Sequence, residues 1–320
     1  METLPLFDEP SEFDRSSLHA KLAVLASNDI FIGTSSWKYP GWLGQIYSPQ
    51  RYMVRGRFSE RRFEAECLNE YAATFPIVCG DFSFYQFPSE AYWKRLFASG
   101  PGSLKYAFKV PEEITVKMFP IHPRYGARAG DPNPSFLDAL LFRNAFLDLL
   151  EPYRERIAVL IFEFGAFPKQ CYRDVTEFVA ELHPFLAALP PLFRYAVEIR
   201  NQEFLSADYF SCLRHHGIAH VFNSWTRMPD LGEQIEIPDS YTADFTVARA
   251  LLRRGRSYEN AVAGFSPYKQ VQDPNPDARQ ALRALIARSR KRHEPSYIFV
   301  NNRLEGNAPQ TIEAIVEAEA

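Results

Sequence analysis

The sequence predicts a single (β/α)8 barrel of the TIM type. Eight short apolar runs alternate along the chain with segments whose apolar residues recur at helical spacing. The composition shows no internal break, and the 320 residues suit one large domain, since single barrels of about 250 residues are common. An open, doubly wound sheet is less favoured because it more often has fewer strands. We expect the barrel over residues 29–320.

An N-terminal arm should precede the barrel. Residues 1–28 begin with acidic and polar residues, with prolines at positions 5 and 10, and continue with a short helical pattern over 18–25. We interpret this segment as loosely ordered, or as an arm that packs against the barrel.

Each predicted strand is a short apolar run that stops at a glycine, a proline or a polar residue. The strands are predicted over residues 30–32, 77–85, 104–110, 158–164, 193–199, 218–222, 245–251 and 297–300. The helices are predicted over residues 63–75, 89–97, 135–150, 173–189, 277–291 and 309–317, with one more beginning at 206. The connections 111–134 and 228–241 are the hardest to assign.

The stretch from Ile30 to Pro49 stands out because a buried strand ends in four small residues and an aromatic loop follows. Its rings are Trp37, Tyr39, Trp42 and Tyr47. One interpretation is a stacking wall, made above all by Trp37 and Tyr39, for a flat or sugar-like ligand. The other is an aromatic plug that closes one end of the core.

Composition and charge narrow the function classes. The net charge is −3 and the sequence pI about 6.2, so no global positive field indicates a nucleic-acid partner. The basic run 51–62 is either a phosphate-facing loop or a solvated surface, so nucleic acid stays a weakly supported partner.

The four cysteines lack zinc-like spacing, and neither a signal segment nor 18 continuous apolar residues occur. We therefore expect a cytoplasmic protein with no membrane partner. The sequence does not indicate an oligomeric state.

In such a barrel the active site lies at the carboxyl ends of the strands, and the residues there are consistently polar. The predicted ligand-binding residues are Ser35, Trp37, Tyr39, Asp81, Ser83, Tyr85, Glu163, Asn201, Asn223, Arg249, Asn301 and Asn302.

Glu198, Lys109 and Arg200 are the candidate catalytic residues. Glu198 and Arg200 lie two apart on a strand end and point to the same face, so they are either a general acid or base with its orienting cation or a structural ion pair. Lys109 is either an anion clamp or a partner for Glu198 or Glu163.

No metal or other cofactor is predicted. The seven histidines do not converge on the barrel mouth, and a magnesium site made only of Asp81, Glu163 and Glu198 has no spacing signature. Phosphate-binding glycine loops, nucleophile elbows and dinucleotide fingerprints are also missing from the sequence.

Five motifs resemble, in order and separation, those of the YecE-like family, a domain-of-unknown-function family numbered 72. They are GTSSWKYPGWLGQIYSP, FSFYQFPS, YAFKVPEEIT, YAVEIRNQEFL and YIFVNNRLEGNAP. The resemblance covers roughly residues 30–318 and implies a TIM barrel. Family members usually have histidine where this chain has Asn201 and Arg303, and usually read Asn-Ser-Thr-Phe-Tyr at residues 81–85. These departures indicate a divergent member.

Two functions follow as hypotheses. The first is a metal-independent hydrolase or lyase that acts on a sugar-containing or phosphorylated small molecule at the barrel mouth. The second is a protein that binds a small molecule or a nucleic acid on the same scaffold without turning it over.

Overall fold

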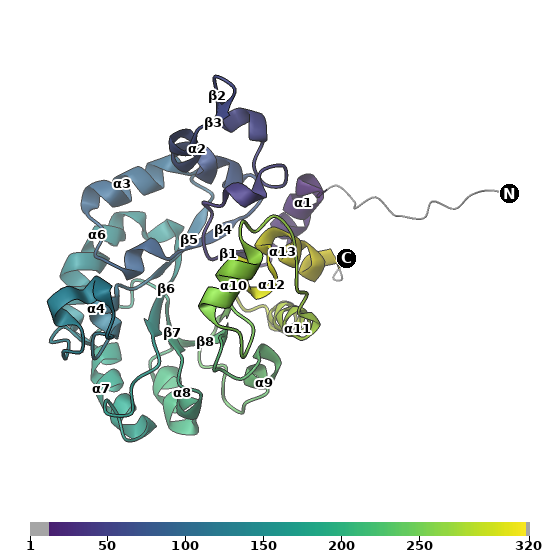
Figure 1. Ribbon diagram of the computed structural model, residues 1–320. Coiled ribbons are helices and arrows are strands. Elements are labelled where there is room, and N and C mark those ends of the chain that lie inside the picture. The colour runs from purple at the N-terminus through teal and green to yellow at the C-terminus, as the bar shows by residue number, and fades with distance from the viewer. Residues whose placement is uncertain (1–12, 318–320) are drawn as a thin grey trace.

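A computed structural model describes residues 13–317, and within them eight parallel strands close into a barrel (Figure 1). Around the barrel the strands run in the order β1, β10, β9, β8, β7, β6, β5, β4. They are β1 (Ile30–Thr34), β4 (Ile77–Gly80), β5 (Lys105–Lys109), β6 (Ile157–Phe164), β7 (Tyr195–Ile199), β8 (Ala219–Ser224), β9 (Thr246–Ala250) and β10 (Ser296–Val300). The predicted (β/α)8 fold is confirmed.

Helices surround the barrel, as the coiled ribbons of Figure 1 show. The longer ones are α1 (Arg15–Ala26), α2 (Glu60–Ala72), α3 (Glu90–Ser99), α7 (Val175–Ala187), α8 (Ala207–His215), α10 (Tyr258–Phe265), α11 (Pro276–Arg292) and α13 (Ala308–Glu317). The shorter ones are α4 (Glu112–Thr115), α5 (Ala139–Phe142), α6 (Asp148–Leu150), α9 (Leu231–Ile235) and α12 (Asn302–Glu305). A small hairpin, β2 (Met53–Val54) and β3 (Arg57–Phe58), projects after the first strand.

The helix predicted over 135–150 begins four residues late, at Ala139. Leu137 has a positive φ of 55°, a conformation that no helix accepts, and the side chain of Asp138 caps the backbone N–H of Leu141. From Ala139 the helix continues through a π turn, Arg143–Leu147, to Leu150.

Inside the barrel, apolar layers lie below a polar one. On β6, Val159 and Ile161 belong to the interior apolar cluster, and Glu163 follows at the same two-residue period. On β7, Ala196 lies in that cluster and Glu198 follows it. The period of the strands therefore carries the last inward side chains, several of them charged, to the barrel mouth.

The N-terminal segment, as far as the structure describes it, packs against the barrel. Helix α1 lies against β1 and α13, and it buries Leu18, Leu22 and Leu25. The part of the predicted arm that covers residues 1–12 lies outside the described residues. Within residues 13–317, none of the helices combines the length and the apolar character that a membrane span requires.

Candidate functional site

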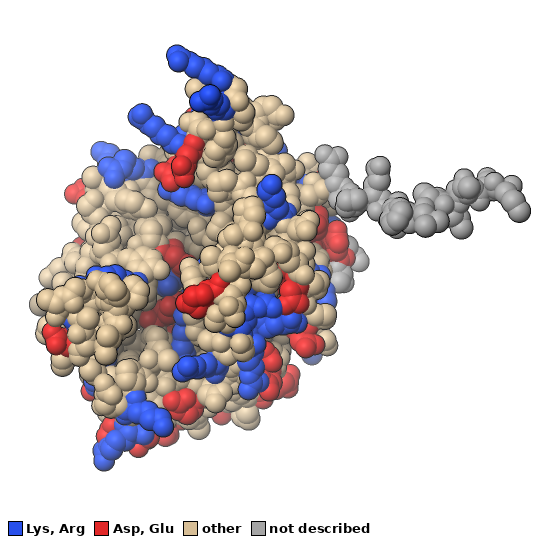
Figure 2. All heavy atoms as spheres, in the orientation of Figure 1, with Lys and Arg blue, Asp and Glu red and all other residues tan. Residues whose placement is uncertain are grey.

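Six charged side chains meet at the carboxyl ends of five of the barrel strands, β4, β5, β6, β7 and β9, and we call them the ionic cluster. They are Asp81, Lys109, Glu163, Glu198, Arg200 and Arg249. Figure 2 shows acidic and basic side chains next to one another in a shaded hollow near the centre of the face that it presents. With three carboxylates and three cations, the cluster has no net formal charge.

Arg249, on β9, reaches across the barrel and holds the three carboxylates together. Its guanidinium contacts Glu163 at 2.7 Å, Asp81 at 3.2 Å and Glu198 at a shorter distance, and its side chain is 1% exposed. Burial alone would lower the pKa of Arg249, but the carboxylates, Glu198 first, outweigh it and raise that pKa. Arg249 is therefore a fixed positive charge.

Glu163 is the most heavily paired carboxylate of the cluster. Its Oε2 lies 3.0 Å from Lys109 Nζ, 2.9 Å from Arg200 Nη2 and 2.7 Å from Arg249 Nη1. Burial would raise the pKa of Glu163, but these cations, Arg200 foremost, hold it well below its usual range. Glu163 is therefore ionised at neutral pH and does not serve as a proton donor.

Two aromatic rings lie over two of the cations. The guanidinium carbon of Arg200 lies 3.7 Å from the ring centroid of Trp225, and Lys109 Nζ lies 3.8 Å from that of Phe84. Both rings are half-buried, so they shield the cations on one side and present apolar surface to solvent.

Asp81 is the most accessible carboxylate of the cluster. Its side chain is 30% exposed, against 6% for Glu163 and none for Glu198. Its contacts with Arg249 and with Lys109, at 3.9 Å, both involve Oδ1. Among the hydrogen bonds of the described residues none uses Oδ2, so this oxygen can accept a hydrogen bond from a ligand.

Comparisons with known proteins identify the family of this chain. Residues 31–320 match the model of a family described as a protein of unknown function, DUF72. This chain belongs to the DUF72 family. The match covers almost the entire chain, and it confirms the resemblance that the five motifs indicate.

Solved structures of DUF72 proteins have the same fold. A DUF72 protein from Thermotoga maritima is 19% identical, with a TM-score of 0.60, over 91% of this chain and 98% of its own. One from Enterococcus faecalis V583 is 15% identical, with a TM-score of 0.59, over 91% and 97%. Among proteins with curated descriptions, none matches this chain significantly.

In this DUF72 protein the aromatic loop is a plug, so the interpretation of Trp37 and Tyr39 as an open stacking wall needs correction. Trp42 and Tyr47 are fully buried, and the ring of Trp37 is buried with its edge against Phe82, 6.2 Å between centroids. Tyr39 is half-buried against Trp42, and burial raises its pKa to about 12. The rings of this loop pack on one another and on aromatic rings of other segments, Tyr52, Phe63, Phe82 and Tyr268.

Four other predicted ligand-binding residues are not members of the ionic cluster, and two of them are held by hydrogen bonds within the fold. The hydroxyl of Ser83 donates to the carbonyl of Lys109 at 2.7 Å, and the Asn201 side-chain oxygen accepts from the backbone of Phe167 at 2.7 Å. Tyr85 is 60% exposed beside Arg124. Ser35 is buried at the end of β1, and its hydroxyl has no hydrogen-bond partner among the described residues.

The side chains of the three other predicted asparagines make hydrogen bonds within the fold, mostly to backbone groups. Asn223 donates to the carbonyl of Ile199 at 3.1 Å, and Asn301 caps α12 by accepting from the N–H of Arg303. The oxygen of Asn302 accepts from Trp42 Nε1 at 3.2 Å and from the N–H of Ala308 at 2.8 Å. All three are buried, and their hydrogen bonds among the described residues go to groups other than the charged side chains of the ionic cluster.

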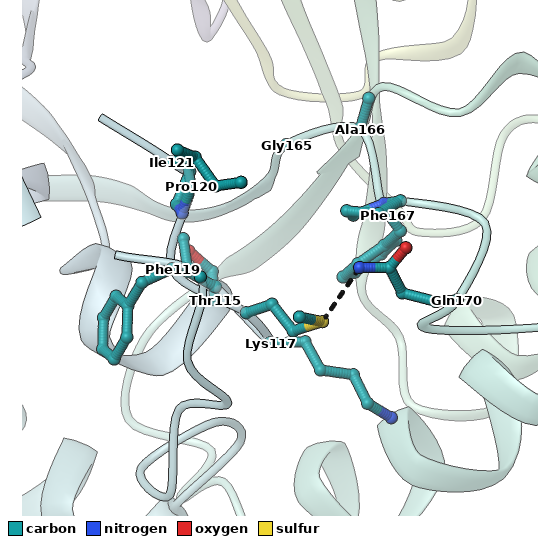
Figure 3. A pocket seen from close by; sticks show the side chains of 13 residues that line it. Thr115, Lys117, Phe119, Pro120, Ile121, Gly165, Ala166, Phe167 and Gln170 are labelled. Carbon is teal, nitrogen blue, oxygen red and sulfur yellow. Dashed lines mark hydrogen bonds between the residues drawn. The ribbon is translucent and has the colours of Figure 1, made fainter. Parts of the chain in front are cut away.

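A pocket of about 410 Å³ that sequence reasoning did not find opens beside β6. Figure 3 shows Pro120 and Ile121 across it from Ala166 and Phe167. Ile121 is 93% exposed, and the wall is formed by the connection 111–134, whose structure the sequence pattern does not specify. The pocket is also lined by Gly165, which lies two residues beyond Glu163 in the sequence. The pocket and the ionic cluster are therefore close together along the chain.

Proposed function

We propose that the ionic cluster binds a sugar-containing or phosphorylated small molecule and promotes its hydrolysis or elimination without a metal ion. Asp81 carries the proposal: it is a partly exposed carboxylate between two cations, and its hydrogen bond with Arg249 uses only one of its oxygens. A carboxylate in such a place is suited to accept a proton from water or from substrate. The three carboxylates already neutralise three cations, so their oxygens are poorly suited to a divalent metal.

In this proposal Lys109 and Arg200 bind the anionic part of the ligand. Both lie at the mouth, with side chains that are 7% and 11% exposed, and both contact Glu163. A phosphate or carboxylate that enters the hollow would share these cations with Glu163, and the negative charge that develops on a departing oxygen would be stabilised there. The half-exposed rings of Trp225 and Phe84 offer apolar faces to a sugar ring.

Glu198 is then a positioning residue and not the acid or base that its sequence position suggests. It is fully buried, its Oε1 accepts from Arg200 at 3.1 Å, and its Oε2 accepts from Arg249. Because both oxygens are engaged, Glu198 orients the two arginines.

The test is a thermal-shift screen of sugar phosphates, nucleotides and neutral sugars, followed by three variants. A ligand at about 100 times its dissociation constant adds about 2.7 kcal/mol of stability. Asp81→Asn should keep the shift and lose turnover, and Lys109→Met should lose the shift. Lys105→Met is the matched control: Lys105 lies at the other end of β5 and donates to the carbonyl of Glu155. If no anionic compound stabilises the protein, or if Lys109→Met responds like Lys105→Met, the proposal is wrong.

The second candidate is binding without turnover. The observation that favours it is that the ionic cluster is balanced and internally paired, as a structural network is. A stabilising ligand that is recovered unchanged after long incubation would support it. An oligonucleotide ligand would be recognised by binding that weakens steeply as salt rises.

A further inference from the structure

Away from the barrel mouth, side chains of the metal-ligating type meet on the outer layer, where α7 packs against α8. His183 is on α7, Cys212 is on α8, and His216 is the C-cap residue of α8. Cys212 and His216 are four residues apart, so both project from one side of α8 toward its neighbour. A third histidine, His215, lies beside them, with its ring centroid 5.4 Å from that of His183 and 4.9 Å from that of His216.

The distances suit a single ion. One ligand atom from each of His183, Cys212 and His216 lies within 4.8 Å of the other two, and His216 Nε2 lies 3.0 Å from His183 Nδ1. Four-coordinate zinc, with bonds of about 2.0–2.1 Å to nitrogen and about 2.3 Å to sulfur, needs ligand atoms roughly 3.3–3.7 Å apart. The ligand atoms therefore need small adjustments to reach these separations, and His183 is exposed and free to rotate.

The surroundings suit ligation by nitrogen and sulfur. His216 is half-buried, and its ring lies against those of His183 and His215, with centroids 4.7 Å and 4.9 Å away. Cys212 is buried, and its thiol would release its proton when it binds an ion. A surface hollow of about 500 Å³, lined in part by His183, Cys212 and Asp208, gives access to the ion and to water.

We propose that His183, Cys212 and His216 bind a transition-metal ion of the zinc class, with water as the fourth ligand, and that this ion ties α7 to α8. Two imidazoles and a thiolate select zinc-like ions over magnesium and calcium, which prefer oxygen ligands. The site is separate from the ionic cluster and does not depend on the function proposed for it.

The experiment uses the full chain, freed of metal and of any affinity tag, and titrates it with Co²⁺. One equivalent should give a thiolate-to-cobalt charge-transfer band and the visible bands of four-coordinate cobalt, and Zn²⁺ should abolish both by displacement. Zn²⁺ should also raise the melting temperature. Cys212→Ser should lose the charge-transfer band, and His183→Gln should weaken Zn²⁺ binding by about 100-fold or more, since even outer-shell changes cost about 10–100-fold.

Matched controls are Cys171→Ser and His19→Ala, which change a half-buried cysteine and an exposed histidine elsewhere. Both should bind Co²⁺ and Zn²⁺ as the unchanged protein does. Because His183 is exposed, His183→Gln tests the site even if Cys212→Ser folds poorly. The proposal is overturned if the unchanged protein shows no saturable binding of one equivalent, or if Cys212→Ser keeps the charge-transfer band.

Discussion

Glu163 and Glu198 lie side by side in register on β6 and β7, and one nitrogen of Arg249 contacts both carboxylates. Two like charges at neighbouring positions of a sheet repel each other, and here they do so in a buried place. The guanidinium supplies the charge and the hydrogen bonds that make the arrangement stable. The stability of the barrel mouth therefore depends on a residue two strands away from Glu198.

The first prediction concerns this guanidinium. Arg249→Met should lower the free energy of unfolding by about 3–5 kcal/mol, because it leaves buried carboxylates without their cation. Arg254→Met is the matched control, since Arg254 pairs at the surface with Glu233 at 3.0 Å and should cost only about 0–1 kcal/mol. Urea unfolding followed by circular dichroism measures both. Equal losses in the two variants would contradict the role given to Arg249.

The second prediction separates positioning from stability at Glu198. Glu198→Gln should cost about 1–3 kcal/mol, because the buried arginines lose a charged partner, and should also abolish the stabilisation by any ligand found in the screen. Melting shifts are compared from each variant's own baseline, with Glu233→Gln as the surface control. A loss of stability with the ligand response intact would leave Glu198 with a purely structural role.

Much of the ionic cluster could be predicted from the sequence because strands have a period of two. Once the apolar runs are placed, Glu163, Glu198 and Arg249 must follow the inward apolar residues of their strands, and all three were predicted at the mouth. The full pairing was not predictable: Arg200 and Lys109 were the expected partners of Glu198, and the strand pattern does not tell that Arg249 reaches across the barrel to it.

The predictions for the residues that do not belong to the ionic cluster were wrong for a different reason. Asn302 bonds to Trp42, 260 positions away, and this contact converts an amide at a strand end into a brace for the aromatic loop. The sequence did not predict that Trp225 lies over Arg200 and Phe84 over Lys109, because such contacts between a ring and a cation depend on the geometry of the loops. Local patterns carry information about strands and caps, but not about how loops fold over one another.

The third prediction tests the tight contact between β1 and β4. Gly33 lies so close to β4 that a Cβ would stand 1.9 Å from the carbonyl oxygen of Ile77. Gly33→Ala should therefore force the strands apart and cost about 1–3 kcal/mol or more in urea unfolding. Gly102→Ala is the control, because an added Cβ there has nothing within 4 Å. If the two variants unfold at the same urea concentration, the closeness of the strands is not as described.

The last prediction concerns His220, a buried histidine on β8 that takes no part in the ionic cluster. Its Nδ1 lies 3.2 Å from the hydroxyl of Tyr209, and its Nε2 has no hydrogen-bond partner among the described residues. Burial lowers its pKa from 6.5 to about 3, so the folded protein keeps the ring neutral where the unfolded chain would protonate it.

Protonation of the unfolded chain at His220 should therefore destabilise the protein as the pH falls below 6.5. The loss amounts to about 1.4 kcal/mol per pH unit until the folded pKa is approached. His220→Phe removes this proton, so the stability of the unchanged protein relative to the variant should fall by that amount for each unit between about pH 6 and pH 4. Urea unfolding at several pH values measures the difference, and His19→Ala, at an exposed position, serves as the control. Parallel curves for the unchanged protein and His220→Phe would mean that His220 is protonated in the folded barrel.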